Sequence, residues 1–108
     1  MNQREFADIV LNDARAYAAG MGYQFGPGAD SFVEGHLLQA GSEVENAPSA
    51  DQQQKLSEAQ RAARILINSM IVQVDQIAGY RAMSPGKIGE DTLAGALNSG
   101  ICPLWPFC

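Results

Sequence analysis

The segment from Ser49 to Ala78 places apolar residues at intervals of three and four over roughly 30 positions, which is the spacing of one helix face. A helix of that length is a rod of about 45 Å. The expected core-facing residues, which cover an arc of about 140°, are Leu56, Ala59, Ala63, Leu66, Ile67, Met70, Ile71, Val74, Ile77 and Ala78. A chain of 108 residues has room for one domain, so the other elements are expected to pack around this rod.

Three shorter segments also have helical spacing, and they span residues 3–19, about 30–41 and about 90–98. Ser31 and Glu34 fit a capping box at the start of the second of these, and Gly41 is expected to end it. No segment alternates as a half-buried strand does.

The fold class that follows is all-α. We expect a small helical bundle of three to four helices with one long central helix at about 50–78. A single helical domain would cover residues 1–100, and an irregular hydrophobic tail would follow at 101–108.

Two features of the long segment point beyond a plain bundle. Its first third, Asp51 to Ala62, is more polar than the rest, so it is either an arm that projects toward a partner or a solvated helix end. Ile65 and Val72 lie outside the core arc, seven residues apart, and form a second, narrow apolar seam. That seam either packs against another helix of the domain or contacts a second copy or a partner.

The charge of the chain excludes several classes of partner. Twelve acidic residues outnumber seven basic ones, the net charge is −5, and the basic residues form no cluster. Nucleic acid and an anionic membrane surface are therefore not expected partners. The most apolar stretch, Ile65 to Ala78, is too short and too polar to span a bilayer. Residues 1–5 contain no apolar signal region, so a cytoplasmic location is the expectation, although a chain whose signal had been removed would look the same.

No recognisable catalytic or metal-binding set is present. His36 is the only histidine, and no cysteine or second histidine lies at helical spacing from it, as a metal site would need. A nucleophile pair of His36 with Cys102 or Cys108 would depend on a terminal tail to hold the thiol. We therefore expect no enzyme activity, no cofactor and no metal.

The last eight residues concentrate the unusual side chains. Both cysteines, Cys102 and Cys108, and the only tryptophan, Trp105, lie there. A disulfide between the cysteines would close a small ring worth about 2 kcal/mol. In a reducing compartment the thiols would stay free.

Three interpretations of this tail remain open. Ile101, Leu104, Trp105 and Phe107 could fold back onto the core, with the two cysteines as small buried hydrophobic residues. The tail could instead be presented outward, with Trp105 as an anchor for a groove on another protein, or as the processed segment of a leader-plus-core peptide precursor. Finally, the two thiols could bind a soft metal ion such as Cu(I) or Zn, or undergo redox chemistry.

The resulting functional hypothesis is a non-enzymatic recognition or interaction protein that presents a short hydrophobic C-terminal segment. Its candidate binding or processing residues are Cys102, Trp105, Phe107 and Cys108. The partner would be another protein, either a modifying enzyme or a binding protein. The alternative is a self-associating structural or phage-like assembly protein, which would pair through Ile65 and Val72 while its tail packs on its own core.

Overall fold

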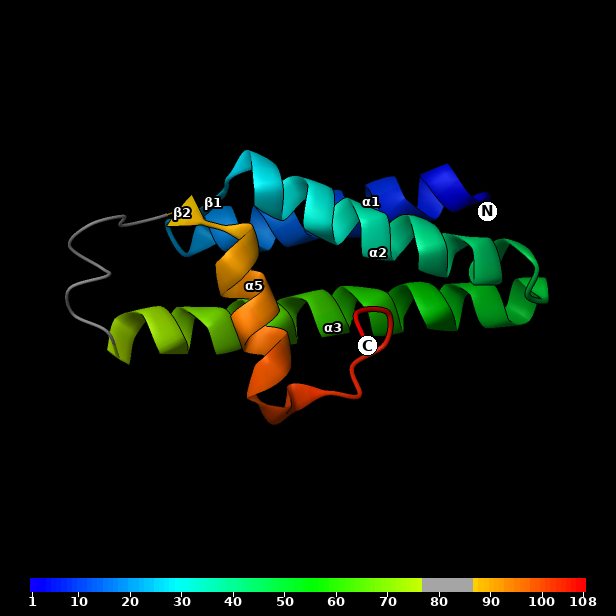
Figure 1. Cartoon of the computed structure of the whole chain (residues 1–108). Coiled ribbons are helices and arrows are strands. Elements are labelled where there is room, and N and C mark those ends of the chain that lie inside the picture. The colour runs from blue at the N-terminus through cyan, green and yellow to red at the C-terminus, as the bar shows by residue number, and fades with distance from the viewer. Residues whose placement is uncertain (77–86) are drawn as a thin grey trace.

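The computed structural model describes the backbone of residues 1–76 and 87–108, and the side chains of residues 1–70, 87–98 and 100–108. The long helices are α1 (Gln3–Gly20), α2 (Pro27–Glu45) and α3 (Ser49–Gln76). A short helix, α5 (Glu90–Ala96), continues into a wider helical turn, η1 (Leu97–Ile101). The expected all-α bundle with one long helix is confirmed (Figure 1).

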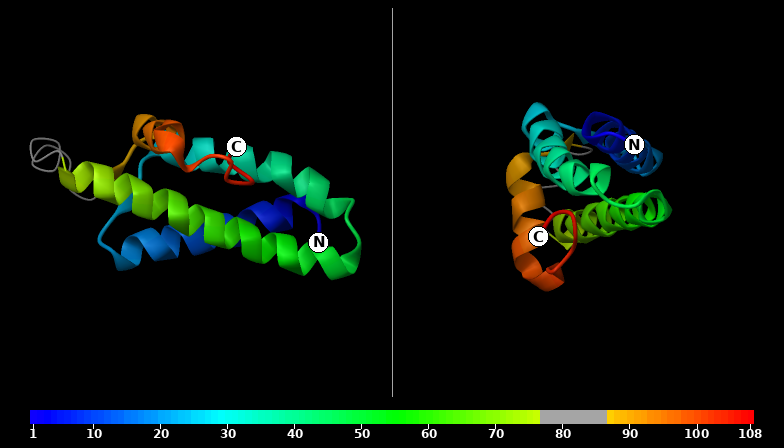
Figure 2. Two further views of the ribbon diagram at one scale, coloured as in Figure 1. Left: turned by 90° about the horizontal axis from the view of Figure 1, so that it is seen from below. Right: turned by 90° about the vertical axis from the view of Figure 1, so that its right-hand side faces the viewer.

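The three long helices lie side by side along the long axis of the molecule, and α5 runs across them (Figure 1). Seen end-on in Figure 2, α1, α2 and α3 form a triangle, and α5 covers the side where α2 and α3 meet. The C-terminal tail follows α5 and returns over the same side. This arrangement brings the last residues of the chain against the middle of the bundle.

Helices α1 and α3 run parallel, with a constant offset along the chain. Three side-chain or terminal contacts each join residues 51 positions apart. The pairs are Met1 with Gln52, Asp13 with Arg64, and Tyr17 with Asn68. A constant offset places successive turns of the two helices level with one another, as parallel rods require.

The polar start of α3 lies against the bundle and does not project as an arm. The side-chain amide of Gln52 donates to the carbonyl oxygen of Ala47 at 3.1 Å and accepts from the amino group of Met1 at 3.2 Å. Leu56 and Ala59 are buried, one and two turns further along. These contacts hold the first turns between the α2–α3 connection and the beginning of α1.

Helix α2 is longer at both ends than its sequence pattern predicts. It starts at Pro27, with Gly26 as N-cap, so Ser31 and Glu34 do not form the expected capping box. Proline is favoured in the first turn because its missing N–H has no helical partner there anyway. Gly41 does not end the helix: a Cβ at this position would lie 2.7 Å from the carbonyl oxygen of Gln3. The glycine therefore permits close approach of α1 and α2.

A two-residue parallel bridge, which the sequence pattern did not predict, joins β1 (Gln24–Phe25) to β2 (Lys87–Ile88). The N–H of Gly26 also donates to the carbonyl oxygen of Ile88 at 2.9 Å. Strands this short show no alternation that could be recognised beforehand. The bridge fixes the start of α5 beside the start of α2.

The core lies where the long helices meet, and its largest fully buried side chains include Phe6, Leu37, Leu66, Ile67 and Met70. The predicted core face of α3 is confirmed at Leu56, Ala59, Ala63, Leu66, Ile67 and Met70, and Ala62 joins it. The side chains of Ile71 and Val74, and residues Ile77 and Ala78, lie outside the described part of the chain. No described helix combines the length and the apolar character that crossing a bilayer would require.

Candidate functional site

The C-terminal segment forms a closed loop. Cys102 and Cys108 are joined by a disulfide, with their Cα atoms 5.9 Å apart. Inside the ring, the backbone N–H groups of Phe107 and Cys108 both donate to the carbonyl oxygen of Leu104, at 2.7 and 3.1 Å. Gly100, with φ of 95°, turns the chain out of η1, a conformation that glycine adopts without strain. We call residues 102–108 the C-terminal loop.

Phe107 anchors this loop in the core. Only 4% of its surface is exposed, and its ring lies 5.9 Å from the ring of His36 on α2. Side chains from four helices, among them Ala14, Val33 and Leu93, surround the same small apolar space. Of the three interpretations of the tail, the structure has the one in which it folds back onto the body, but the expectation that the cysteines are buried is wrong, since Cys102 and Cys108 are exposed and joined by the disulfide.

Trp105 is half-buried and lies across the outer edge of the core. Its ring centroid is 6.2 Å from that of Phe6 on α1. The amino group of Lys55 on α3 lies 5.2 Å from the centroid, within cation–π range. Neither Phe6 nor Lys55 was singled out by sequence reasoning, since their contacts with Trp105 depend on how the helices cross. One part of the Trp105 ring is thus fixed, and the other remains available to solvent.

His36 has a packing role beneath the loop. Its ring makes a tilted contact with Phe32, with the centroids 4.8 Å apart, and an edge contact with Phe107. Burial lowers the pKa of His36 below 6.5 because the protonated imidazole would lose hydration there. The neutral form is therefore favoured, and the ring contributes to two aromatic contacts.

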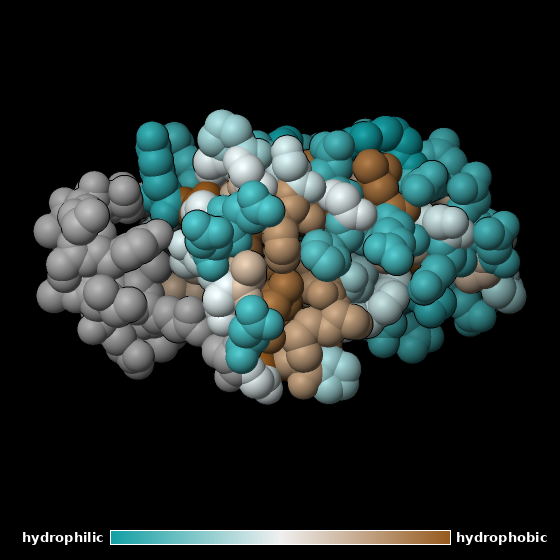
Figure 3. All heavy atoms as spheres, viewed as in Figure 1, coloured by the Kyte–Doolittle hydropathy of each residue, from teal (hydrophilic) through white to brown (hydrophobic). Residues whose placement is uncertain are grey.

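An open hollow of about 310 Å³ borders the loop on the α2 side. The α2 residues that line it are His36, Gln39, Ala40 and Glu43, and the loop supplies Trp105, Pro106, Phe107 and Cys108. Figure 3 shows the molecular face that carries α5 and the loop, where apolar side chains gather at the centre and hydrophilic ones surround them. The site therefore combines an apolar floor with polar side chains at its edge.

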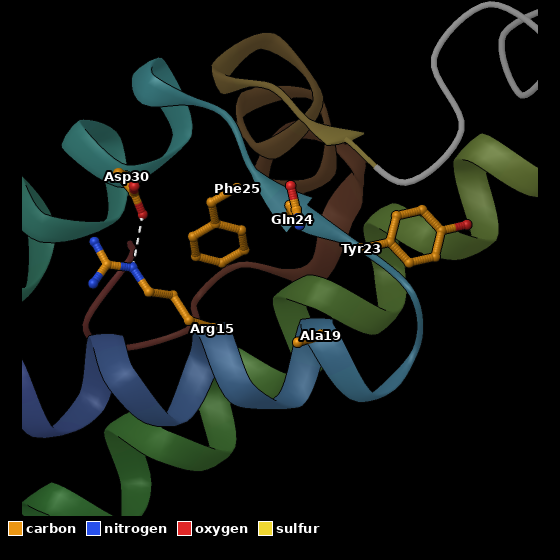
Figure 4. A pocket seen from close by; sticks show the side chains of 6 residues that line it. All are labelled: Arg15, Ala19, Tyr23, Gln24, Phe25 and Asp30. Atoms are coloured by element: carbon orange, nitrogen blue, oxygen red, sulfur yellow. Dashed lines mark hydrogen bonds and ion pairs between the residues drawn. The ribbon is translucent and has the colours of Figure 1, made fainter.

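A second hollow, of about 290 Å³, lies where α1 ends and α2 begins (Figure 4). Phe25 turns its ring into this space, and the hydroxyl end of Tyr23 points away from it. On one side, Arg15 Nε donates to a carboxylate oxygen of Asp30 at 3.0 Å. The two charges in the hollow pair with each other, and the lining side chains include no Ser, Thr, Cys, Lys or His.

Of the two residues of the predicted seam on α3, the structure describes the side chain of Ile65 only. This side chain is 41% exposed, so no other helix in the described part of the chain covers it fully. Its neighbour Arg64 bonds to Asp13 and lies 5.0 Å from the ring of Tyr17, which closes the α1–α3 edge. The side chain of Val72 lies outside the described part of the chain.

Among the described residues, no group of three or more His, Cys, Asp or Glu side chains is placed to hold a metal ion. The two cysteines are paired with each other. Comparison of the chain with protein-family models, with curated proteins and with solved structures found no match. The geometry of the C-terminal loop therefore provides the basis for a functional proposal.

Proposed function

We propose that this protein is a non-enzymatic recognition module whose partner-binding surface is the docked C-terminal loop and the hollow beside it. The observation that carries the proposal is that two aromatic residues of the loop are buried to different extents and have different roles. Phe107 is buried and holds the loop, while Trp105 is only half-buried and keeps part of its ring exposed.

A loop fixed in this way loses little further freedom when a partner binds. Immobilising side chains and loops at an interface normally costs affinity, and a loop that is already closed and docked avoids much of that cost. Tryptophan is among the residues enriched at interface hot spots, because its large rigid ring fills a pocket on the partner. The partner we propose is another protein that covers Trp105 and inserts an apolar side chain into the hollow.

The leader-plus-core precursor remains a narrower form of the same hypothesis. Cys102 and Cys108 are both exposed, so an enzyme could reach them. Phe107 would first have to leave the core before the segment could enter an active site as an extended substrate. The intact mass of the protein isolated from its native host tests this form, because processing would change that mass.

Self-association is the rival proposal, and the exposed Ile65 supports it. Size-exclusion chromatography with light scattering decides between a monomer and a dimer. If the wild type is a dimer and Ile65→Glu is a monomer, the seam is an interface. A monomeric wild type would leave the rival without support.

Site-specific photo-cross-linking in an extract of the source cells tests the recognition module. A photoreactive residue at Gln39, which is exposed beside the hollow, should capture a protein partner, and one at Asn12, which is exposed on α1, should not. Adding Trp105→Ala should abolish the product at Gln39. Tyr23→Ala, another half-buried aromatic outside the loop, is the matched control and should leave the product unchanged. Equal products from both positions, or none at Gln39, would refute the proposal.

A further inference from the structure

The disulfide lies at the surface, although the ring it closes is anchored in the core. Cys102, Pro103 and Cys108 are exposed, whereas Phe107 within the same ring is buried. Thiol–disulfide exchange requires an attacking thiolate to reach one of the two sulfur atoms. In this protein a small thiol has that access without unfolding the bundle.

The surroundings of the two sulfur atoms differ. The open hollow lined by Gln39 and Glu43 borders Cys108, and it gives an attacking thiol room to approach. The Sγ of Cys102 lies 3.3 Å from the carbonyl oxygen of Leu97, which can accept a weak hydrogen bond from a thiol at that position. The room beside Cys108 makes this sulfur the more accessible point of attack, and Cys102 is the sulfur that departs.

Opening the ring removes a constraint on the docked loop. In the chain-entropy model, a ring this small restricts the undocked states enough for its opening to weaken docking on the order of 30-fold. The remaining contacts are those of Phe107 with His36 and of Trp105 with Phe6 and Lys55. Once Phe107 leaves, the apolar space that it shares with the core opens to solvent.

We propose that the Cys102–Cys108 disulfide is a thiol–disulfide exchange site for a dithiol reductant, and that its reduction releases the C-terminal loop from the bundle. One part of this inference, that loop release controls a partner-binding surface, rests on the function proposed above. The other part, that exchange releases the loop, rests only on the exposure of the disulfide and the burial of Phe107. The compartment's redox state then sets whether the loop is docked or free.

The exchange proceeds in two balanced steps. One thiolate of the dithiol attacks Sγ of Cys108, the S–S bond breaks, and Cys102 leaves with the electron pair and takes a proton from water. The second thiol of the reductant loses its proton and attacks its own sulfur in the mixed disulfide. Cys108 leaves as the second thiol, and the dithiol has become a disulfide.

Trp105 is the only tryptophan, so its fluorescence reports the position of the loop. The oxidised full-length protein is treated with dithiothreitol without denaturant, and free thiols are counted by mass after alkylation with iodoacetamide. Two alkylated cysteines are expected, together with a shift of Trp105 emission to longer wavelength as the ring leaves Phe6 for water. Far-UV circular dichroism should show that the helices persist.

The double variant Cys102→Ser/Cys108→Ser should emit at the reduced wavelength with or without dithiothreitol. If this variant does not fold, the wild type before and after reduction still decides the question. Cysteines that stay protected from the reductant would overturn the inference, as would two alkylated cysteines with unchanged emission. If the loop is released on reduction but no cross-link forms at Gln39, the proposed function is refuted and this inference stands. If the cross-link forms but reduction does not release the loop, this inference is refuted and the proposed function stands.

Discussion

The ring of Phe107 lies edge-on to the ring of His36, with the two centroids 5.9 Å apart. The docked loop therefore lies directly against the one imidazole whose pKa is lowered by burial. Phe32 also contacts this ring, with the centroids 4.8 Å apart. A charge on His36 would therefore have to be accommodated in contact with two aromatic side chains.

Acidification should destabilise the protein through His36. Burial lowers the folded-state pKa of His36 below its unfolded value of 6.5, so the unfolded chain binds the proton first. The contribution of neutral His36 to the free energy of unfolding is complete above pH 6.5. It falls as the pH drops toward the lower pKa of the folded state. Melting temperatures measured across this range should fall more for the wild type than for His36→Gln. Glu43→Gln, in the same hollow, controls for the nearby carboxylate, and equal slopes for wild type and His36→Gln would contradict the prediction.

Truncation of the anchor should cost far more than truncation of an exposed apolar residue. Phe107→Ala removes a buried ring and should lower the free energy of unfolding by about 3 kcal/mol. Ile9 is 36% exposed, so Ile9→Ala should cost less than about 1 kcal/mol. Urea unfolding of both variants measures the difference. A Phe107→Ala variant as stable as Ile9→Ala would show that the loop does not dock in solution.

Two glycines of α2 should respond in opposite directions to the same substitution. Gly41→Ala places a Cβ against the backbone of Gln3 and should destabilise by about 1–3 kcal/mol, since both helices must move apart. At Gly35 nothing lies within 4 Å of the added Cβ. Gly35→Ala should therefore stabilise by about 0.5–1 kcal/mol through helix propensity. Thermal unfolding of the two variants checks the sign, and a tolerated Gly41→Ala would refute the close approach.

The ion pair on the α1–α3 edge should contribute little. The Arg64 and Asp13 side chains are 51% and 23% exposed, and their closest N–O distance is 2.9 Å. Exposed pairs of this kind have coupling energies of about 0.2–1 kcal/mol. A double-mutant cycle of Arg64→Ala and Asp13→Ala should fall in this range and decrease in high salt. A coupling energy that exceeds this range and does not change with salt would indicate that the edge is desolvated, for example by a second copy of the chain.

The three long helices were predictable because their apolar residues repeat over several turns. The seven-residue spacing of Ile65 and Val72 likewise marked a position that the structure leaves exposed at Ile65. Gly41 was misinterpreted because a helix stop and a close approach of two backbones both favour glycine, and only the position of Gln3 distinguishes them.

The candidate site was predictable in its residues but not in its geometry. The concentration of Cys102, Trp105, Phe107 and Cys108 marked the segment. Whether Phe107 or Trp105 would be the buried ring depended on the crossing of α5 over the long helices, which no local pattern encodes. Lys55 and His36 join the site from two other helices, and their long sequence separation from the tail hid this role.

The parallel alignment of α1 and α3 has a consequence for how the chain folds. The side-chain hydrogen bonds between α1 and α3 each span 51 residues, whereas the pairs α1–α2 and α2–α3 are antiparallel neighbours along the chain (Figure 1). Local helical hairpins close before long-range contacts because the entropy of loop closure grows with separation. The Asp13–Arg64 edge should therefore form after the folding transition state, so that its loss accelerates unfolding and leaves the folding rate almost unchanged.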